Sequence, residues 1–208
     1  PLADVDARTY TLLITSDRGT ATPAASETAY TYEWGDTVTC SMDTTGVVGY
    51  ECTGWTGTGV VPASGTVLTT GEVTFQVDAQ TATASTITWN WRETVPPTVT
   101  VEQAAGQADP SKSFPITFDV HFSEVVDDFA AEDVIWAGST AGGIVHETHG
   151  TDGTHFTIEV TAANSDGTLV PAIAADSAHD AAGNGNLVST ATDGTVTLDT
   201  QAPTAVLS

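Results

Sequence analysis

Apolar residues alternate with polar ones in short segments along the first half of the chain, with polar turns between the segments. A period of two is the pattern of a half-buried strand, because successive side chains of a strand point to opposite faces. The clearest alternations are Tyr10, Leu12 and Ile14; Val73, Phe75 and Val77; and Ile87, Trp89 and Trp91. No convincing amphipathic helix pattern accompanies them. We therefore expect a small β-rich domain over residues 9–93, preceded by a polar linker over residues 1–8.

The second half continues this pattern over about seven strands at even spacing. Its clearest alternations are Ile116, Phe118, Val120 and Phe122, followed by Phe156, Ile158 and Val160. Residues 129–134 have room for one helical turn. Seven short strands over such a length favour an antiparallel immunoglobulin-like sandwich. The predicted fold class is all-β, with two β-rich modules in series.

One linker pattern occurs twice in the chain. An acidic residue, a Thr, two further residues and Pro-Thr precede an apolar segment at residues 93–99 and again at residues 199–205. The two copies delimit a second domain over residues 94–203, and the proline restricts the hinge. Residues 204–208 are expected to open a following module or to act as a strand exchanged with a partner. Repeated spacing of this kind is typical of a tandem array.

The charge of the chain is strongly one-sided. There are 27 Asp and Glu residues against 4 Lys and Arg, which gives a formal net charge of −23. Nucleic acid and anionic membrane surfaces are disfavoured as partners, because both are recognised by clusters of Lys and Arg. No segment approaches the roughly 18 consecutive apolar residues of a membrane span, so membrane insertion is not expected. So acidic a surface favours a salty habitat, bound Ca²⁺, or both.

The two cysteines, Cys40 and Cys52, lie close together in the first half. One interpretation is a disulfide that closes a hairpin between two apolar segments. A bridge over so short a loop would contribute about 3 kcal/mol by restricting the unfolded chain, and it would indicate an oxidising compartment. The alternative is two buried thiols.

Four segments of the second half carry a resemblance to a known family. They are residues 97–101, 122–124, 129–134 and 180–186. Together they resemble a bacterial Ig-like module over about residues 95–203. Modules of this family recur in long surface proteins and adhesins, so the resemblance implies a scaffold role and supplies no active site.

Two segments of the first half, residues 32–38 and 52–57, resemble a divergent repeat of the internalin B-repeat type. Repeats of that type are small β-rich extracellular modules. The resemblance covers about residues 9–92 and again implies a scaffold.

The strongest candidate site is a calcium site at the domain junction. In an Ig-like sandwich, the loops that contain Glu124 and Asp180 with Asn184 lie at the pole where the chain enters, beside Glu93 of the linker. Carboxylate and amide oxygens are the ligands that Ca²⁺ prefers. Asp199, the counterpart of Glu93, would serve the next module. The alternative is that residues 180–184 form a turn whose side chains bond their own backbone, with Glu124 a solvated loop acid.

Other titratable groups give weaker patterns. Asp127, Asp128, Glu132 and Asp133 form an acidic cluster that suits a metal, a solvated loop or the cap of a short helical turn. His146 and His149 are three residues apart rather than four, which does not match the zinc metalloprotease motif. We expect exposed sheet or loop histidines there.

Trp89 and Trp91 share one strand face and form a possible platform for a sugar ring, although core or interdomain packing is the alternative. No nucleophile elbow or phosphate-binding loop occurs, so the chain is not expected to be an enzyme.

The sequence favours a structural segment of a secreted bacterial surface, adhesin or filament protein, with a hinge stiffened by Ca²⁺. Its expected partners are further Ig-like modules or identical subunits. The alternatives are a carbohydrate-binding accessory module of a secreted enzyme, which would bind a surface glycan, and a fibre subunit that polymerises by strand exchange.

Overall fold

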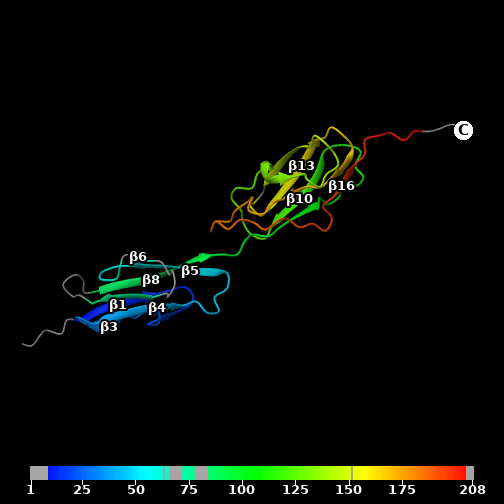
Figure 1. Ribbon diagram of the computed structural model, residues 1–208. Helices are drawn as coiled ribbons and strands as arrows, with labels where there is room; N and C mark the ends of the chain where they lie inside the picture. The colour runs from blue at the N-terminus through cyan, green and yellow to red at the C-terminus, as the bar shows by residue number, and fades with distance from the viewer. Residues whose placement is uncertain (1–8, 63, 66–71, 78–83, 151, 205–208) are drawn as a thin grey trace, which may run out of the picture. The chain divides into compact units, whose positions relative to one another are not determined.

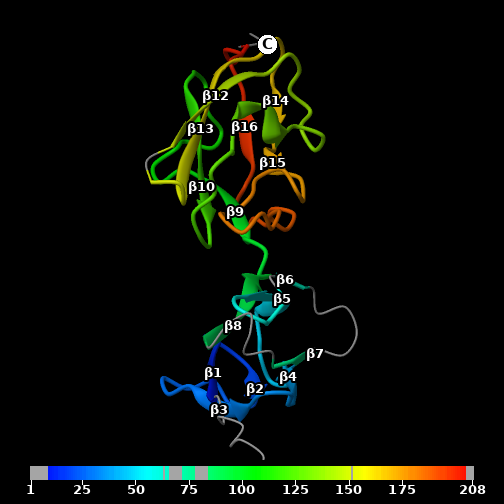
Figure 2. The same cartoon turned by 90° about the vertical axis from the view of Figure 1, so that its left-hand side faces the viewer.

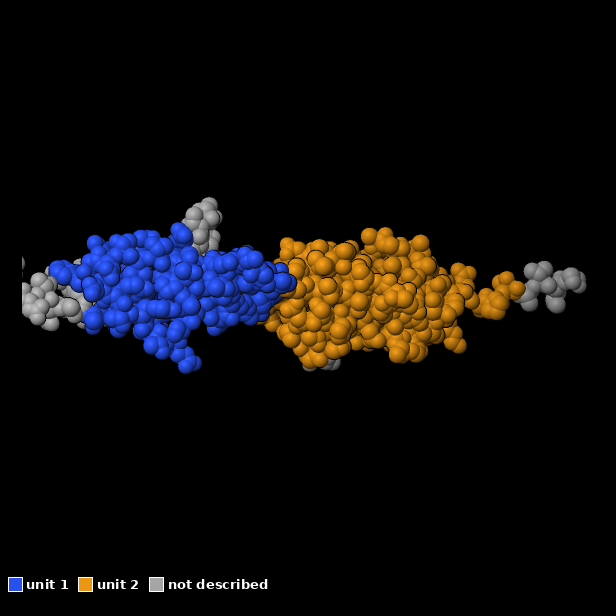
Figure 3. All heavy atoms as spheres, turned by 90° about the horizontal axis from the view of Figure 1, so that it is seen from below, with its two compact units in different colours: residues 1–94 blue, residues 95–208 orange. Residues whose placement is uncertain are grey.

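The computed structural model describes the chain except for residues 1–8, 63, 66–71, 78–83, 151 and 205–208 (Figure 1). It divides into two compact units, residues 1–94 and residues 95–208, which Figure 3 colours separately. The predicted linker over residues 1–8 and most of the predicted strand over residues 204–208 lie outside the described residues. Of the residues that are described, none lies in a helix with the length and hydrophobicity that a membrane crossing requires.

Unit 1 consists of two β-sheets. One has five strands in the order β3-β1-β8-β5-β6, and the other has three strands in the order β2-β4-β7. The strands are β1 Thr9–Thr15, β2 Thr20–Thr22, β3 Tyr30–Glu33, β4 Thr37–Asp43, β5 Tyr50–Gly57, β6 Ser64–Gly65, β7 Glu72–Gln76 and β8 Ala84–Glu93. The alternation seen in the sequence decides which side chains are buried: Tyr10, Leu12 and Ile14 are fully inaccessible to solvent.

The core of unit 1 lies between its two sheets. Val38 and Cys40 of β4 join Ile87 and Trp89 of β8 in one apolar cluster. Trp89 is 2% exposed, and its ring meets that of Trp55 edge to face at 5.9 Å. The proposed sugar platform is therefore wrong for Trp89. Trp91 also packs partly against the core and donates from Nε1 to the Ser16 hydroxyl at 3.0 Å.

Unit 2 is built around a four-stranded antiparallel sheet in the order β12-β13-β10-β9, with two small sheets, β11-β15 and β14-β16, across the core (Figure 2). Its elements are β9 Val99–Gln103, β10 Ile116–Phe122, the 3-10 helix η1 Ala131–Asp133, β11 Val134–Ile135, β12 Val145–Gly150, β13 His155–Ala162, β14 Gly167–Leu169, β15 Ala172–Ile173 and β16 Val196–Leu198. Phe118 and Ile158 of the large sheet pack with Leu169 and Leu198 in the core. The prediction of an all-β fold is confirmed.

Both units share one feature of topology: their first and last described segments run parallel and are hydrogen-bonded. In unit 1, β1 pairs with β8 over five residues, from Thr11 opposite Ala84 to Thr15 opposite Thr88. Within each unit the chain therefore enters at one end and leaves at the other.

In unit 2 the final segment runs alongside the first. The first hydrogen bond between the two segments joins Leu187 N to Pro97 O at 2.8 Å, and the last joins Asp199 N to Ser111 O at 2.9 Å. Between them lie Thr190 N to Val99 O, Val101 N to Thr190 O, Gln103 N to Asp193 O and Ser111 N to Thr197 O. Figure 2 shows the result, with β9 near one end of the unit and the described residues after β16 leaving at the other.

Cys40 and Cys52 are free thiols, which contradicts the predicted disulfide. The hairpin that would carry it is also absent, because Cys40 of β4 lies opposite Val73 and Cys52 of β5 lies opposite Trp91. The two strands belong to different sheets. The thiol alternative was the better interpretation.

Thiol titration checks this directly. Never-reduced protein should give two reactive thiols once it is unfolded, and Cys40 should be unreactive in the folded state. Burial raises the pKa of the Cys40 thiol to about 11, so at neutral pH the side chain is neither accessible nor a thiolate. The control Cys52→Ala should leave a single thiol that reacts only on unfolding. A count of zero in the unfolded, unreduced protein would restore the disulfide.

Candidate functional site at one pole of unit 2

Asp180 organises the loop that precedes the final segment of unit 2. Its carboxylate accepts hydrogen bonds from Ala182 N at 2.8 Å, Asn184 N at 2.9 Å and Asn184 Nδ2 at 2.8 Å. Gly183 completes the turn with φ of 84°, a conformation that glycine adopts without strain. Burial raises the pKa of Asp180, but these hydrogen bonds outweigh it and hold the pKa below the ordinary value.

Asn186, which is 2% exposed, fixes the same loop from inside. Its Oδ1 accepts from Ser177 N and Ala178 N, and its Nδ2 donates to Ala174 O and Leu187 O. Two acceptor and two donor sites are all that an asparagine amide offers, so the side chain is fully satisfied. The amide therefore ties both sides of the loop to the start of the final segment.

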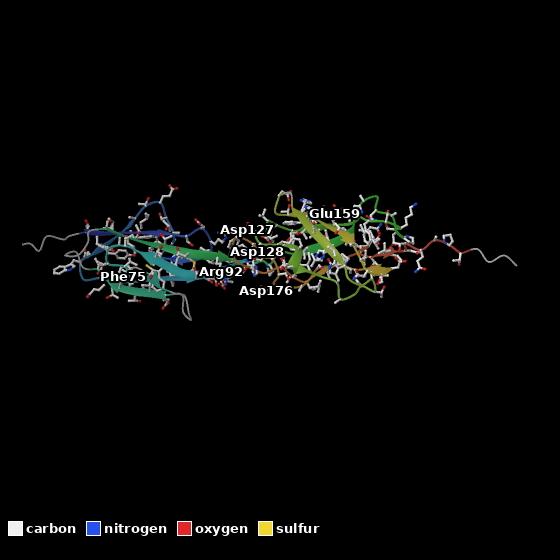
Figure 4. All side chains as sticks on the ribbon, turned by 90° about the horizontal axis from the view of Figure 1, so that it is seen from above. Phe75, Arg92, Asp127, Asp128, Glu159 and Asp176 are labelled. Carbon is white, nitrogen blue, oxygen red and sulfur yellow. The ribbon has the colours of Figure 1, made fainter. Side chains whose placement is uncertain are left out.

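His179 links this loop to the one that follows β10. Asp128 accepts from His179 N at 2.7 Å and contacts His179 Nδ1 at 2.8 Å, while Nε2 lies 3.2 Å from Asp176 Oδ1. Asp127 N also donates to His179 O. Figure 4 shows Asp127, Asp128 and Asp176 together at one end of unit 2. We call Asp128, Asp176 and His179 the polar clasp.

The clasp shifts the pKa values of its members in opposite directions. The hydrogen bond to Asp128 and the charges of Asp128 and Asp176 raise the pKa of His179 despite some desolvation. Desolvation alone would raise the pKa of Asp128, but the bonds from the backbone and ring of His179 lower it. Each shift favours the charged form, as in an ion pair.

Two of the predicted calcium ligands, Asp180 and Asn184, are hydrogen-bonded to each other. Glu124 follows β10, Glu93 ends β8 in unit 1, and Asp199 follows β16 where the parallel run of unit 2 ends. Among the described residues, no three His, Cys, Asp or Glu side chains are grouped to hold a metal. Calcium binding by this set stays a prediction, whereas the turn alternative for residues 180–184 is what the structure contains.

Sequence reasoning assigned no role to His179 and treated Asp128 as one of four clustered acids. Asp133 of that cluster caps η1, as one of the alternatives predicted, because its carboxylate accepts from Ala130 N at 2.9 Å. Asp176 has a φ of 63°, a left-handed conformation that is uncommon in residues other than glycine. This backbone conformation is seen only in the structure, so the sequence did not indicate a role for Asp176.

The polar clasp should stabilise unit 2 over a bounded pH range. The stabilisation from His179 is complete below its ordinary pKa of 6.5 and is lost as pH rises through the raised value. The stabilisation from Asp128 is complete above 3.8 and is lost as pH falls through the lowered value. The clasp therefore contributes most between these two pH values.

Denaturant unfolding of the full chain, followed by amide signals of unit 2, measures this contribution. His179→Gln should cost more stability at about pH 5 than at about pH 9. His149→Gln, on exposed β12, is the control outside the polar clasp. The His149 ring lies 3.9 Å from Glu147 in an exposed pair, so its pH-dependent difference should be much smaller. Equal losses for His179→Gln at both pH values would mean that the ring makes no charged contact.

Comparison with known proteins gives one match. No curated protein and no solved structure matches the chain. A family model described as bacterial Ig-like domain matches residues 93–197, just over half of the chain. Domains of this family are typically extracellular and non-enzymatic. The match does not reach residues 9–92, so their resemblance to internalin B-repeats stays a prediction. Through its second unit, the chain belongs to the bacterial Ig-like domain family.

Proposed function

We propose that this chain is a tension-bearing spacer in a bacterial cell-surface or secreted multidomain protein. The observation that carries the proposal is the parallel pairing of first and last segments in both units. A spacer must hold its two ends apart, and this pairing puts them at opposite ends of each unit. The family match supports an extracellular structural role.

The direction of the hydrogen bonds gives the mechanical argument. When the chain is pulled at both ends, two parallel segments slide past each other, so their hydrogen bonds are loaded together. Each bond contributes only about 1 kcal/mol to equilibrium stability. Resistance to force comes from the requirement that several break at once. In unit 2 the bonds extend from Pro97–Leu187 to Ser111–Asp199.

The polar clasp fits the same role. Its carboxylates and imidazole bond to one another and to backbone groups across two loops. Asp180 and Asn186 likewise bond within their own loop. These groups fasten the pole at which the final segment begins. Further Ig-like modules or identical subunits are the proposed partners, on the ground that the linker pattern recurs at residues 199–205.

The carbohydrate-binding alternative has less support, because its aromatic candidates contribute to packing. Trp89 is buried, and Trp91 packs partly against the core with its Nε1 bonded to the Ser16 hydroxyl. The strand-exchange alternative involves residues 1–8 and 204–208, nearly all of which lie outside the described part of the chain. A tension-bearing spacer is the function that the described contacts favour.

Single-molecule stretching of the full chain tests the proposal. Thr190→Pro removes the Thr190 N–H that donates to Val99 O, while the Thr190 side chain itself is exposed. We expect the variant to lower the unfolding force of unit 2. Thr190→Val keeps the backbone N–H and should leave the force unchanged. An unaltered force in Thr190→Pro would contradict a tension-bearing role for the parallel run.

A further inference from the structure

Two histidines lie directly opposite each other on the outer face of the large sheet of unit 2. β10 and β13 pair over six residues, from Ile116 opposite Val160 to His121 opposite His155. Val120 and Phe122 flank His121 and point into the core, so His121 points outward. The His155 side chain is 57% exposed. Both strands are visible side by side in Figures 1 and 2.

The two imidazole rings are already close. Their centroids are 4.4 Å apart, and the ring planes are inclined at 61°. When two imidazoles bind one ion through nitrogens about 2.0–2.1 Å away, in adjacent coordination positions, their centroids lie about 4.5–5 Å apart. The observed separation of 4.4 Å is close to that range. The backbone pairing of β10 and β13 keeps the two residues directly opposite each other.

We propose that His121 and His155 form a binding site for a divalent transition-metal ion such as Zn²⁺, Ni²⁺ or Cu²⁺. Imidazole nitrogen suits these ions, whereas Ca²⁺ and Mg²⁺ prefer oxygen. The chain supplies two ligands at this point, since no triad of metal-binding side chains gathers among the described residues. Water or a ligand from another molecule completes the coordination, so binding should be of micromolar rather than structural strength.

Asp152 provides independent support, because it orients His155 as a metal ligand is usually oriented. Its Oδ2 lies 3.1 Å from His155 Nδ1, which also contacts Thr154 Oγ1 at 2.8 Å. Its Oδ1 accepts from Thr154 Oγ1, His155 N and Thr154 N. A carboxylate on one ring nitrogen fixes the tautomer and strengthens the other nitrogen as a ligand. Coordination by His155 therefore uses Nε2.

The surrounding charge favours a cation. Asp119 of β10 points to the same outer face as His121, two residues away. The whole chain has a net charge of −23, which raises the local concentration of divalent ions. General attraction of this kind does not distinguish Zn²⁺ from Mg²⁺, whereas the imidazole pair does.

Isothermal titration calorimetry of the full chain with Zn²⁺ or Ni²⁺, in excess Mg²⁺ to saturate weak acidic sites, tests the proposal. We expect one equivalent to bind. His121→Ala and His155→Ala should each weaken binding at least about tenfold, and Asp152→Asn should weaken it by about tenfold. The control His149→Ala removes a histidine of the neighbouring strand β12 and should leave the affinity unchanged.

Ring signals in NMR spectra provide a second measurement that does not depend on stability. Those of His121 and His155 should shift together at one equivalent of metal, while those of His146 and His149 should not. Absence of binding in excess Mg²⁺, or equal binding by the His121→Ala, His155→Ala double variant, would overturn the proposal. The pair would then be an aromatic contact only.

Discussion

The parallel pairing of first and last segments is the constraint on which the rest of each unit depends. In unit 1 it joins β1 to β8 within the five-stranded sheet, and β4 and β7 pack in the second sheet across the core. In unit 2 it places the segment from Leu187 to Asp199 beside the segment from Pro97 to Ser111. The first and last segments of each unit are thereby bonded to each other along the length of the unit.

The fold class was predictable because it depends on local periodicity. Tyr10, Leu12 and Ile14 are buried as their alternation indicates. Periodicity does not give the strand order or identify which face of a strand is buried. The wrong predictions of a disulfide and of a sugar platform at Trp89 both follow from this. Cys40 and Cys52 are near in sequence but lie on different sheets. Trp89 was correctly placed on one face with Trp91, and that face is the core side of β8.

The candidate sites were harder to predict because they depend on distant residues. The turn at Asp180 is local, and its Asp-x-x-Gly-Asn spacing was recognisable in the sequence. The contact of His179 with Asp128 joins two loops from different parts of the chain. The facing of His121 and His155 depends on the register of β10 against β13, which no spacing in the sequence encodes.

Comparison of two pulling directions on unit 2 is the most direct test of the central claim. In one direction the full chain is held at its two ends, so the segments that meet at Val99 and Thr190 slide in shear. In the other direction, the protein is held so that the force peels the final segment away from the first one hydrogen bond at a time. The account predicts a clearly higher unfolding force for the end-to-end direction. Equal forces in both directions would contradict it, since the parallel bonds would then carry no shared load.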